Sequence, residues 1–511
     1  FLQIPPEPDF FIYGLFFQKN MNESEIEIEN RLLASNEDRS VNQSGIRKGT
    51  LVPNWPALII QVGFALSWTM FYINMVIFNN MIWPDGIFRA QELGFFFGIA
   101  GIISAFTGII FGRLADKHSR IALMAFEIGM TGLGFFINSL IPIGQGYTTY
   151  YWFLFLNIFR TIFMGGFYST LSSFVNDAIE EQKRSAFFGK LAALSQIFQV
   201  LGMILSAWVF QNAFWRQFLL GLAILYFAIF ACILIFGKEP KRGAMTKELK
   251  EIVSDGNAKY TYQLNKDTIK KTLLSKTNII VLLEGIFTSV ISSIPDFLII
   301  SYMQLPPHNL SPLSASLLMV FFGVLGAILG SIGFAKLSDT LEKKNIQNRI
   351  YMITCSISII FVCYILFFAL PFPELTPEQG NNIAEIFTHP ISWVFAIQIF
   401  IVRAVFGIYM INQPPVIQKI NLPEAQGTIT SLNGFLESIG TGAGPIIAGT
   451  LLFLFNGNFF LTAFITLVIG LFGGFCWLLA TKTINADISI IEEILATRAK
   501  EMQNQNQEKV E

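Results

Sequence analysis

Charge, cysteine and histidine are all scarce in this chain of 511 residues. Charged residues make up 14% of it, against 53% hydrophobic residues and a mean hydropathy of +0.55, which excludes an ordinary soluble globular protein. Its four cysteines stand at no metal-ligand spacing, so neither a disulfide framework nor a zinc site is expected. The three histidines, His118, His308 and His389, do not cluster with cysteine or carboxylate residues. We therefore predict that the chain is not an enzyme and needs no metal and no cofactor.

The sequence contains long runs without any charged residue. A helix that spans a bilayer needs about 20 mainly apolar residues, and runs such as Pro56–Pro84 and Leu93–Gly112 provide them. The run Ser438–Thr481 is long enough for two helices. We predict an all-α membrane protein with twelve transmembrane helices in two pseudo-symmetric six-helix bundles. These helices are expected near residues 55–80, 90–111, 120–141, 149–174, 184–210, 214–237, 278–303, 311–336, 349–370, 389–415, 427–455 and 459–481.

The distribution of Lys and Arg predicts the orientation. Of the 34 Lys and Arg residues, all but Arg89, Arg216, Arg160 and Arg403 fall on the side of the two termini. The positive-inside bias then places both termini in the cytoplasm, and we expect a multi-pass protein of the cell membrane. The expected parts are a tail (1–53), an N-terminal bundle (54–237), a central loop (238–277), a C-terminal bundle (278–482) and a second tail (483–511). Residues 244–255 of the central loop predict either an amphipathic interfacial helix or a linker helix packed on the bundles.

The two predicted halves contain a weak repeat. GRLAD (112–116) follows the second helix, and AKLSD (335–339) follows the eighth. Arg160 in the fourth helix and Arg403 in the tenth are each followed three residues later by Phe. Duplicated six-helix halves are the layout of secondary transporters, which bind substrate between the halves near the middle of the membrane.

Three motifs resemble those of the major facilitator superfamily. They are GRLADKHSR (112–120), GTGAGPIIAG (440–449) and NLPEAQGT (421–428). The resemblance implies alternating access and a cytoplasmic gate, in which Asp116 lies against the start of the eleventh helix and arginines join carboxylates at the end of the fourth. In the family this gate stabilises the outward-open state. The gate residues that the resemblance implies are Gly112, Arg113, Asp116, Arg120, Asp177 and Arg184. The alternative, that these charges only set the topology, explains Lys117 and Arg120 but not Asp116.

A narrower resemblance is to the spinster-like transporters, which move lysophospholipids or sphingolipid-type amphiphiles. It rests on KEPKRG (238–243), on Arg160 and Gly166, and on the spacing of Asp177 and Arg184. That group usually has an acidic residue where this chain has Phe167. Because of this difference, the resemblance does not by itself imply a lipid-like cargo, or proton coupling at position 167.

Arginines in the membrane suggest a substrate site. Arg160 and Arg403 lie close to the expected midplane, where a charge costs from about 2.5 kcal/mol upward unless it faces a polar cavity or a partner. We predict that both bind a carboxylate or phosphate group of the cargo, with Tyr168 and Phe406 beside them. The alternative is that each arginine binds carbonyls or a carboxylate within its own bundle.

Acidic residues in the membrane suggest a coupling site. We predict that Glu437, or secondly Asp296, binds a proton or another coupling ion, and that the helix is locally broken at Pro295. A fixed ion pair of Glu437 with Arg403 or Arg160 is the alternative. Glu127 and Glu284 are expected to belong to ion pairs.

The sequence thus predicts a secondary active transporter for a small organic solute, amphiphilic or anionic, with a lipid-like molecule as the leading candidate. Proton-coupled efflux of varied hydrophobic compounds is one alternative, and a non-transporting membrane sensor on the same fold is another. No G-x-x-x-x-G-K-[ST] motif occurs, so ATP-driven pumping is not indicated. The expected partners are the lipid bilayer, the solute, and protons or another coupling ion. We expect no nucleic acid partner and a monomer.

Overall fold

The computed structural model describes residues 54–179, 181–240, 269, 272–422 and 425–508. Within these ranges the chain is helical and contains no strand. Eleven helices are long and apolar enough to span a membrane. Tyr147–Ala178 is a further helix of 32 residues that is less apolar, so the described part contains helices for all twelve expected spans, besides the long polar helix Ile484–Glu508. The tail 1–53 and the segment 244–255 lie outside the described residues.

The first predicted helix is not continuous. It is divided into α3 (Trp55–Trp68), α4 (Met70–Ile73) and α5 (Met75–Ile82). At the second break the side-chain amide of Asn74 donates to the carbonyl of Met70 (2.7 Å), and competes in this way with the helix backbone. The remaining helices of this half are α6 (Ala90–Lys117), α7 (Arg120–Leu140), α8 (Tyr147–Ala178), α9 (Glu181–Gln211) and α10 (Trp215–Phe236).

The second half begins with α13 (Lys276–Gln304), which runs through Pro295 without a break. The predicted local break at this proline is therefore wrong. The eighth span is α14 (Pro312–Leu318), a π-helical turn η1 (Met319–Val324) and α15 (Leu325–Glu342). It is followed by α16 (Gln347–Ala369), the short α17 (Pro377–Gly380) and α18 (Ile383–Ile386), α19 (Pro390–Lys419), α20 (Gln426–Leu454), α21 (Phe459–Ala480) and α22 (Ile484–Glu508).

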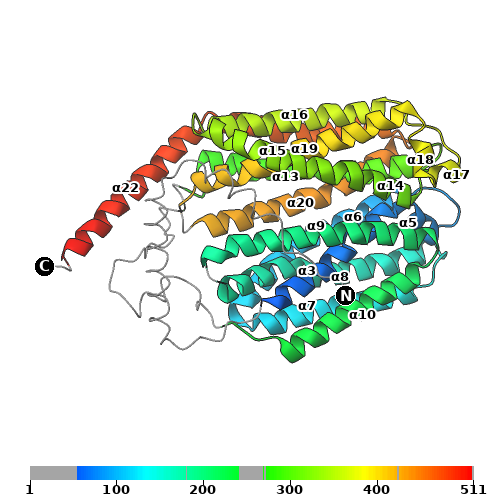
Figure 1. The fold of residues 1–511 in the computed structure, drawn as a ribbon, viewed down its shortest axis with the longest axis horizontal. Coiled ribbons are helices and arrows are strands. Elements are labelled where there is room, and N and C mark those ends of the chain that lie inside the picture. Colours follow the sequence, from blue (N-terminus) through cyan, green and yellow to red (C-terminus); the bar gives the residue numbers. More distant parts are fainter. Residues whose placement is uncertain (1–53, 180, 241–268, 270–271, 423–424, 509–511) are drawn as a thin grey trace, which may run out of the picture. The chain divides into compact units, whose positions relative to one another are not determined.

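The long helices form two bundles (Figure 1). In the first, α7 packs on α8 and α10, and α3 packs on α9; in the second, α13 packs on α21 and α16 on α19. Successive spans alternate in direction. We call the face at which α6, α8, α10, α15 and α19 end the terminal face. The opposite face carries the connections 83–89, 141–146, 212–214, 305–311, 370–389 and 455–458.

Glycines bring α6 and α20, one helix from each bundle, into backbone contact. A Cβ atom on Gly98 would lie 2.2 Å from the carbonyl oxygen of Gly442, and one on Gly94 would lie 2.3 Å from that of Pro445. Small residues at a membrane helix crossing permit such an approach. This crossing fixes the closest contact between the two halves.

Helix α22 lies in the predicted C-terminal tail, where the sequence did not predict a helix. Asp487 of α22 accepts a hydrogen bond from the backbone N–H of Thr277 at the start of α13 (2.9 Å). The hydroxyl groups of Thr277 and Thr483 are 2.7 Å apart. A carboxylate at a helix N-terminus is favourable, so this contact joins α22 to the second bundle.

Candidate substrate cavity

A cavity of about 1820 Å³ lies between the two bundles. Its walls come from α3, α4, α6, α8 and α9 of the first half and from α13, η1, α15, α19 and α20 of the second. Pockets for small molecules usually measure about 300–1,000 Å³. The space is therefore large enough for an organic solute with a long apolar part.

The cavity is open at the terminal face and closed at the opposite face. Its lining includes Arg113, Asp177 and Thr428, which stand at the terminal-face ends of their helices. At the other end the halves meet directly, because the Gln304 amide donates to the carbonyl of Ile73 (2.6 Å) and the Gln211 amide donates to Asn381 (2.9 Å). The structure thus has access to the cavity from one side only.

Arg160 borders the cavity and is only 8% exposed. Its guanidinium donates one hydrogen bond, from Nη2 to Asn157 Oδ1 (3.0 Å), and lies 4.6 Å from the ring centre of Phe135. Its Nε and Nη1 atoms have no hydrogen-bond partner, and it forms no ion pair within the described part of the chain. The ring faces stabilise a cation only in part. Arg160 is therefore a nearly buried positive charge without a counter-charge.

Arg403 also borders the cavity but has a partner. Its Nη2 lies 2.5 Å from Asp296 Oδ1, and the two side chains are 30% and 36% exposed. Both residues belong to the second bundle, so this arginine matches the alternative of a carboxylate in its own bundle. Gly323 in the π-helical turn η1 leaves room for the Arg403 side chain. Such π-helical turns are frequent at functional sites.

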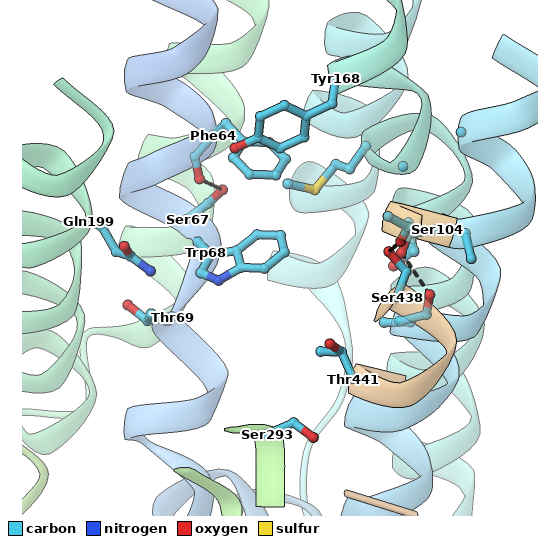
Figure 2. Close-up of a pocket in the computed structure, with 18 of the residues that line it drawn as sticks. Phe64, Ser67, Trp68, Thr69, Ser104, Tyr168, Gln199, Ser293, Ser438 and Thr441 are labelled. Atoms are coloured by element: carbon cyan, nitrogen blue, oxygen red, sulfur yellow. Dashed lines mark hydrogen bonds between the residues drawn. The ribbon is translucent and has the colours of Figure 1, made fainter. Parts of the chain in front are cut away.

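Aromatic side chains form much of the cavity wall (Figure 2). Tyr168 is 55% exposed and Trp68 is 57% exposed, although both lie inside the molecule. The ring of Phe64 lies 5.0 Å from that of Trp68 and 5.5 Å from that of Tyr168. On the other half Phe406 borders the cavity and stacks on Tyr409. Exposed aromatic rings in a wet cavity offer contact area to an apolar part of a ligand.

Hydroxyl and amide groups are interspersed with these rings. Figure 2 shows Ser67 and Trp68 of α3 on one side of the space, and Ser438 and Thr441 of α20 on the other. Several of the hydroxyl groups bond to their own helix, as Ser438 does with the carbonyl of Gly434 (2.8 Å). The cavity thus combines apolar walls with polar groups from both halves. Apart from scattered Ser and Thr residues, nothing in the sequence indicated this hydroxyl lining.

Glu437 does not border the cavity. It accepts hydrogen bonds from Gln413 (2.9 Å) and Asn433 (2.7 Å), and it forms no ion pair with Arg160 or Arg403. Glu127 and Glu284 are buried, and neither forms an ion pair within the residues that the structure describes. The expected ion pairs of Glu127 and Glu284 are therefore wrong, and so is the alternative of a fixed ion pair for Glu437. Each is instead satisfied in part by hydroxyl or amide groups of neighbouring helices.

The residues expected to form the cytoplasmic gate cluster at the terminal face. Gly112, Arg113, Arg120 and Asp177 all border the mouth of the cavity. The Arg120 guanidinium contacts the Asp177 carboxylate within the first half. The side chains of Asp116 and Arg184 lie outside the described part, so the contact of Asp116 with the start of α20 stays a prediction.

Glu239 is a partner of Arg120 that sequence reasoning missed. Its carboxylate accepts from the Ser119 hydroxyl (2.6 Å), from the backbone N–H groups of Arg120 and Ile121 (3.0 Å each) and from Arg120 Nη1 (3.1 Å). Burial acts to raise the pKa of Glu239, but these hydrogen bonds outweigh it and lower the pKa below its ordinary value. An ionised Glu239 thus caps α7 and anchors the chain that follows α10. The motif KEPKRG, which contains this glutamate, was the available signal.

A second charged cluster occupies the equivalent place in the other half. Arg349 pairs with Asp339 (2.6 Å) and with Glu342 (2.7 Å), and Lys419 also reaches Glu342 (3.1 Å). Asp339 belongs to AKLSD, the repeat of GRLAD. The repeat could therefore have located this cluster, but Arg349 lies in another helix and was not identified.

Comparison with known proteins assigns the family. The model of the Major Facilitator Superfamily matches residues 57–445. The chain belongs to the major facilitator superfamily. The fold class, with two six-helix bundles, is thereby confirmed, and so is the integral multi-pass membrane character. No curated protein sequence matches the chain significantly.

Solved structures of this superfamily share the fold. A bacterial homologue of the human lysosomal transporter Spinster, in an inward-facing and unoccupied conformation, is 14% identical, with a TM-score of 0.61 over 85% of this chain and 98% of that one. The nucleoside transporter NupG is 15% identical, with a TM-score of 0.56 over 84% and 99%. An auto-inhibited peptide transporter of the POT family is 12% identical, with a TM-score of 0.59 over 84% and 96%. The predicted likeness to spinster-like transporters is confirmed at the level of the fold.

Proposed function

We propose that this major facilitator protein is a secondary transporter that carries an organic anion with an apolar part, by alternating access. In this proposal both termini lie on the cytoplasmic side of the cell membrane, in agreement with the positive-inside bias. The terminal face is then cytoplasmic, and the state described above is open to the cytoplasm. Residues 54–237 and 278–482 act as the two moving bundles, and 1–53, 238–277 and 483–511 as cytoplasmic tails and loop.

The observation that carries the anion specificity is Arg160. Burying a cation without a counter-charge is unfavourable, and a bound anion would remove this cost. The Nε–H and Nη1–H groups have no partner in the protein and can each donate a charge-assisted hydrogen bond to a carboxylate or phosphate oxygen. Arg403 contributes less because Asp296 already neutralises it. Arg160 is therefore the primary anion site and Arg403 a secondary one.

The apolar part of the cargo would lie along the aromatic wall. Tyr168 and Phe406 come from different halves and both border the cavity. A ligand in contact with both would bridge the halves and leave the rings shielded from water. This arrangement favours an amphiphile, such as a single-chain lipid, over a compact polar anion.

The gate residues serve the change of state. In the present state Arg120 is held by Asp177 and Glu239, all in the first half. Gly112 and Arg113 stand at the open mouth. When the mouth closes, Asp116 completes the contact with the start of α20 that the family resemblance implies, and Arg184 belongs to the charged group at the end of α8. A carboxylate at a helix N-terminus contributes only about 0.3–1 kcal/mol, so the gate can open in each cycle.

Octyl phosphate tests the proposal, because it joins a phosphate to an apolar chain and dissolves in water. Purified wild-type protein is expected to bind it, and Arg160→Gln is expected to weaken binding by tenfold or more, since a charge-assisted hydrogen bond contributes about 1.5–3 kcal/mol. The matched control is Arg216→Gln, because Arg216 bonds to the carbonyls of Ser139 and Ile141 away from the cavity. Unchanged binding in Arg160→Gln would overturn the anion site.

Two further ligands separate the alternatives. Octyl glucoside has the same chain without charge and should bind weakly. Octyltrimethylammonium carries a positive charge, and tight binding of it would instead support efflux of varied hydrophobic compounds.

A further inference from the structure

Glu284 and Glu437 lie in the second bundle, behind the cavity wall. Glu284 on α13 is 0% exposed, and its Oε1 atom accepts hydrogen bonds from the hydroxyl groups of Thr288 and Tyr409, the latter at 3.2 Å. Its Oε2 atom is buried and makes no hydrogen bond of normal geometry, although the indole N–H of Trp477 on α21 interacts with this carboxyl group. A carboxylate in this setting would be an isolated negative charge in the membrane, which is unfavourable, whereas a neutral carboxyl is not.

Glu437 on α20 is the neighbour of this carboxyl. A Cβ atom on Gly285, the residue next to Glu284, would lie 3.2 Å from Glu437 Cγ and 3.3 Å from Asn433 Oδ1. Tyr409 and Gln413, one turn apart on α19, bond to Glu284 and Glu437 respectively. Asn433 Oδ1 is itself buried and without a partner. The carboxyl group of the buried Glu284, that of the partly exposed Glu437 and an unpartnered acceptor therefore lie close together.

The charged and titratable groups around this site come from four helices. They are Asp296 on α13, Tyr364 on α16, Arg403 and Tyr409 on α19, and Cys476 on α21, besides Glu437 on α20. Arg403 is held by Asp296, and no basic side chain pairs with Glu284 or Glu437 in the described ranges.

A small void next to this site shares part of its lining with the cavity. It measures about 10 Å³, and its lining includes Thr288, Tyr409, Ser292, Arg403 and Phe406, with Ile291, Ile357, Ile360 and Val402 as apolar wall. Ser292, Arg403 and Phe406 also border the large cavity. A water molecule needs roughly 10–15 Å³ of such space and two or more polar partners, which this void offers. Hydroxyl groups and one water molecule could thus link Glu284 to the Asp296–Arg403 pair.

We propose that Glu284 and Glu437 form a proton-binding site that is separate from the cargo cavity and exchanges its proton with cavity water through Thr288 and Tyr409. In this proposal Glu284 carries a proton in the present state, as an O–H bond of its carboxyl group. The proton leaves to water when Glu284 ionises and returns from water when Glu284 is protonated again. The proton would then be the coupling ion of the proposed transporter, so the inference rests on the proposed function.

Infrared spectroscopy of the protein in lipid nanodiscs tests this without any cargo. The C=O stretch of a buried neutral carboxyl is expected at neutral pH, with a shift in D₂O, and is expected to disappear on alkalinisation. Glu284→Gln should remove this band, while Glu437→Gln should keep it and move its titration midpoint. Glu127→Gln is the matched control, because Glu127 is a buried carboxyl bonded to a threonine, Thr170 (2.8 Å), in the other half.

Three results would overturn the site. The first is the absence of a band that Glu284→Gln removes. The second is a band that persists at every pH at which the protein stays folded. The third is loss of the band at fixed pH when sodium replaces choline, which would indicate a metal-cation site. In Glu284→Gln the glutamine keeps an acceptor oxygen for Thr288 and Tyr409, so the variant is expected to fold. If it does not fold, Glu437→Gln decides: a titration midpoint of the infrared band equal to that of the wild type overturns the proposal. Binding of octyl phosphate is measured separately, so the two proposals fail independently.

Discussion

At the scale of single residues, the two membrane arginines differ in what neutralises them. Arg160 has only an amide and aromatic rings as neighbours, whereas Arg403 has Asp296. The two occupy matching positions in a repeated sequence, so the repeat alone would have given them the same role. In the proposed function, this difference in partners is the reason why Arg160 is the primary anion site and Arg403 the secondary one.

Removing the charge of Asp296 tests this difference. Asp296→Asn would leave Arg403 without a counter-charge at the cavity wall, so octyl phosphate is expected to bind about tenfold more tightly, which is 1.4 kcal/mol. Arg403→Gln would leave the Asp296 carboxylate alone and should weaken binding. The double variant should return close to the wild-type affinity, and dissociation constants for the four proteins measure it. If Asp296→Asn bound octyl phosphate no more tightly than the wild type, the idea that the net charge of the cavity sets its affinity for anions would be contradicted.

Sequence reasoning found the charged residues but not their partners. Charges within apolar runs are conspicuous, which is why Arg160, Arg403, Asp296 and Glu437 could all be named beforehand. Their pairing depends on which helix faces which, and Asp296 is 107 residues from Arg403. Glu284 was misassigned to an ion pair for the same reason, because its burial follows from the packing of α13 against α20 and α21.

At the scale of helices, the crossing of α6 and α20 holds the halves together through glycine. A Cβ atom at Gly98 would meet the backbone of Gly442 as well as the side chain of Ile446, and the backbone cannot give way by a rotamer change. Neither helix can move aside without separating the bundles. The contact should therefore be sensitive to a single methyl group.

Gly98→Ala tests this contact. We expect a loss of about 1–3 kcal/mol in the free energy of unfolding, because overpacking against backbone is not relieved by rotamer changes. The control is Gly221→Ala in α10, where a Cβ atom would meet nothing within 4 Å. There, a neutral effect or a gain of up to about 1 kcal/mol is expected, since alanine favours a helix. Denaturation in mild detergent compares the two, and equal stability of both variants would contradict the close crossing.

Helix positions were predictable because charge-free runs of sufficient length leave few other choices. The divisions of the first span at Thr69 and Asn74 and the π-helical turn η1 were not, because they depend on local side-chain bonds and on packing. Pro295 illustrates the opposite error, since a proline inside a helix need not break it when neighbouring helices hold the segment.

At the scale of the whole molecule, access to the cavity from one face defines the state. Gln211 and Asn381 join the halves at the opposite face, while Arg113 and Thr428 border an open mouth at the terminal face. Transport by alternating access requires the first contact to break when the mouth closes. A sensor that never transports would not need this exchange.

Counterflow of octyl phosphate in proteoliposomes, measured with the opposite face held closed, tests alternating access most directly. Gln211→Cys and Asn381→Cys would be joined by a short reducible cross-linker, after the exposed Cys232 and Cys355 are replaced by Ser. We predict that cross-linking stops counterflow while binding persists, and that reduction restores it. Counterflow at an unchanged rate while the two cysteines are joined would contradict alternating access. So would the absence of counterflow in the reduced protein, if that protein still binds octyl phosphate.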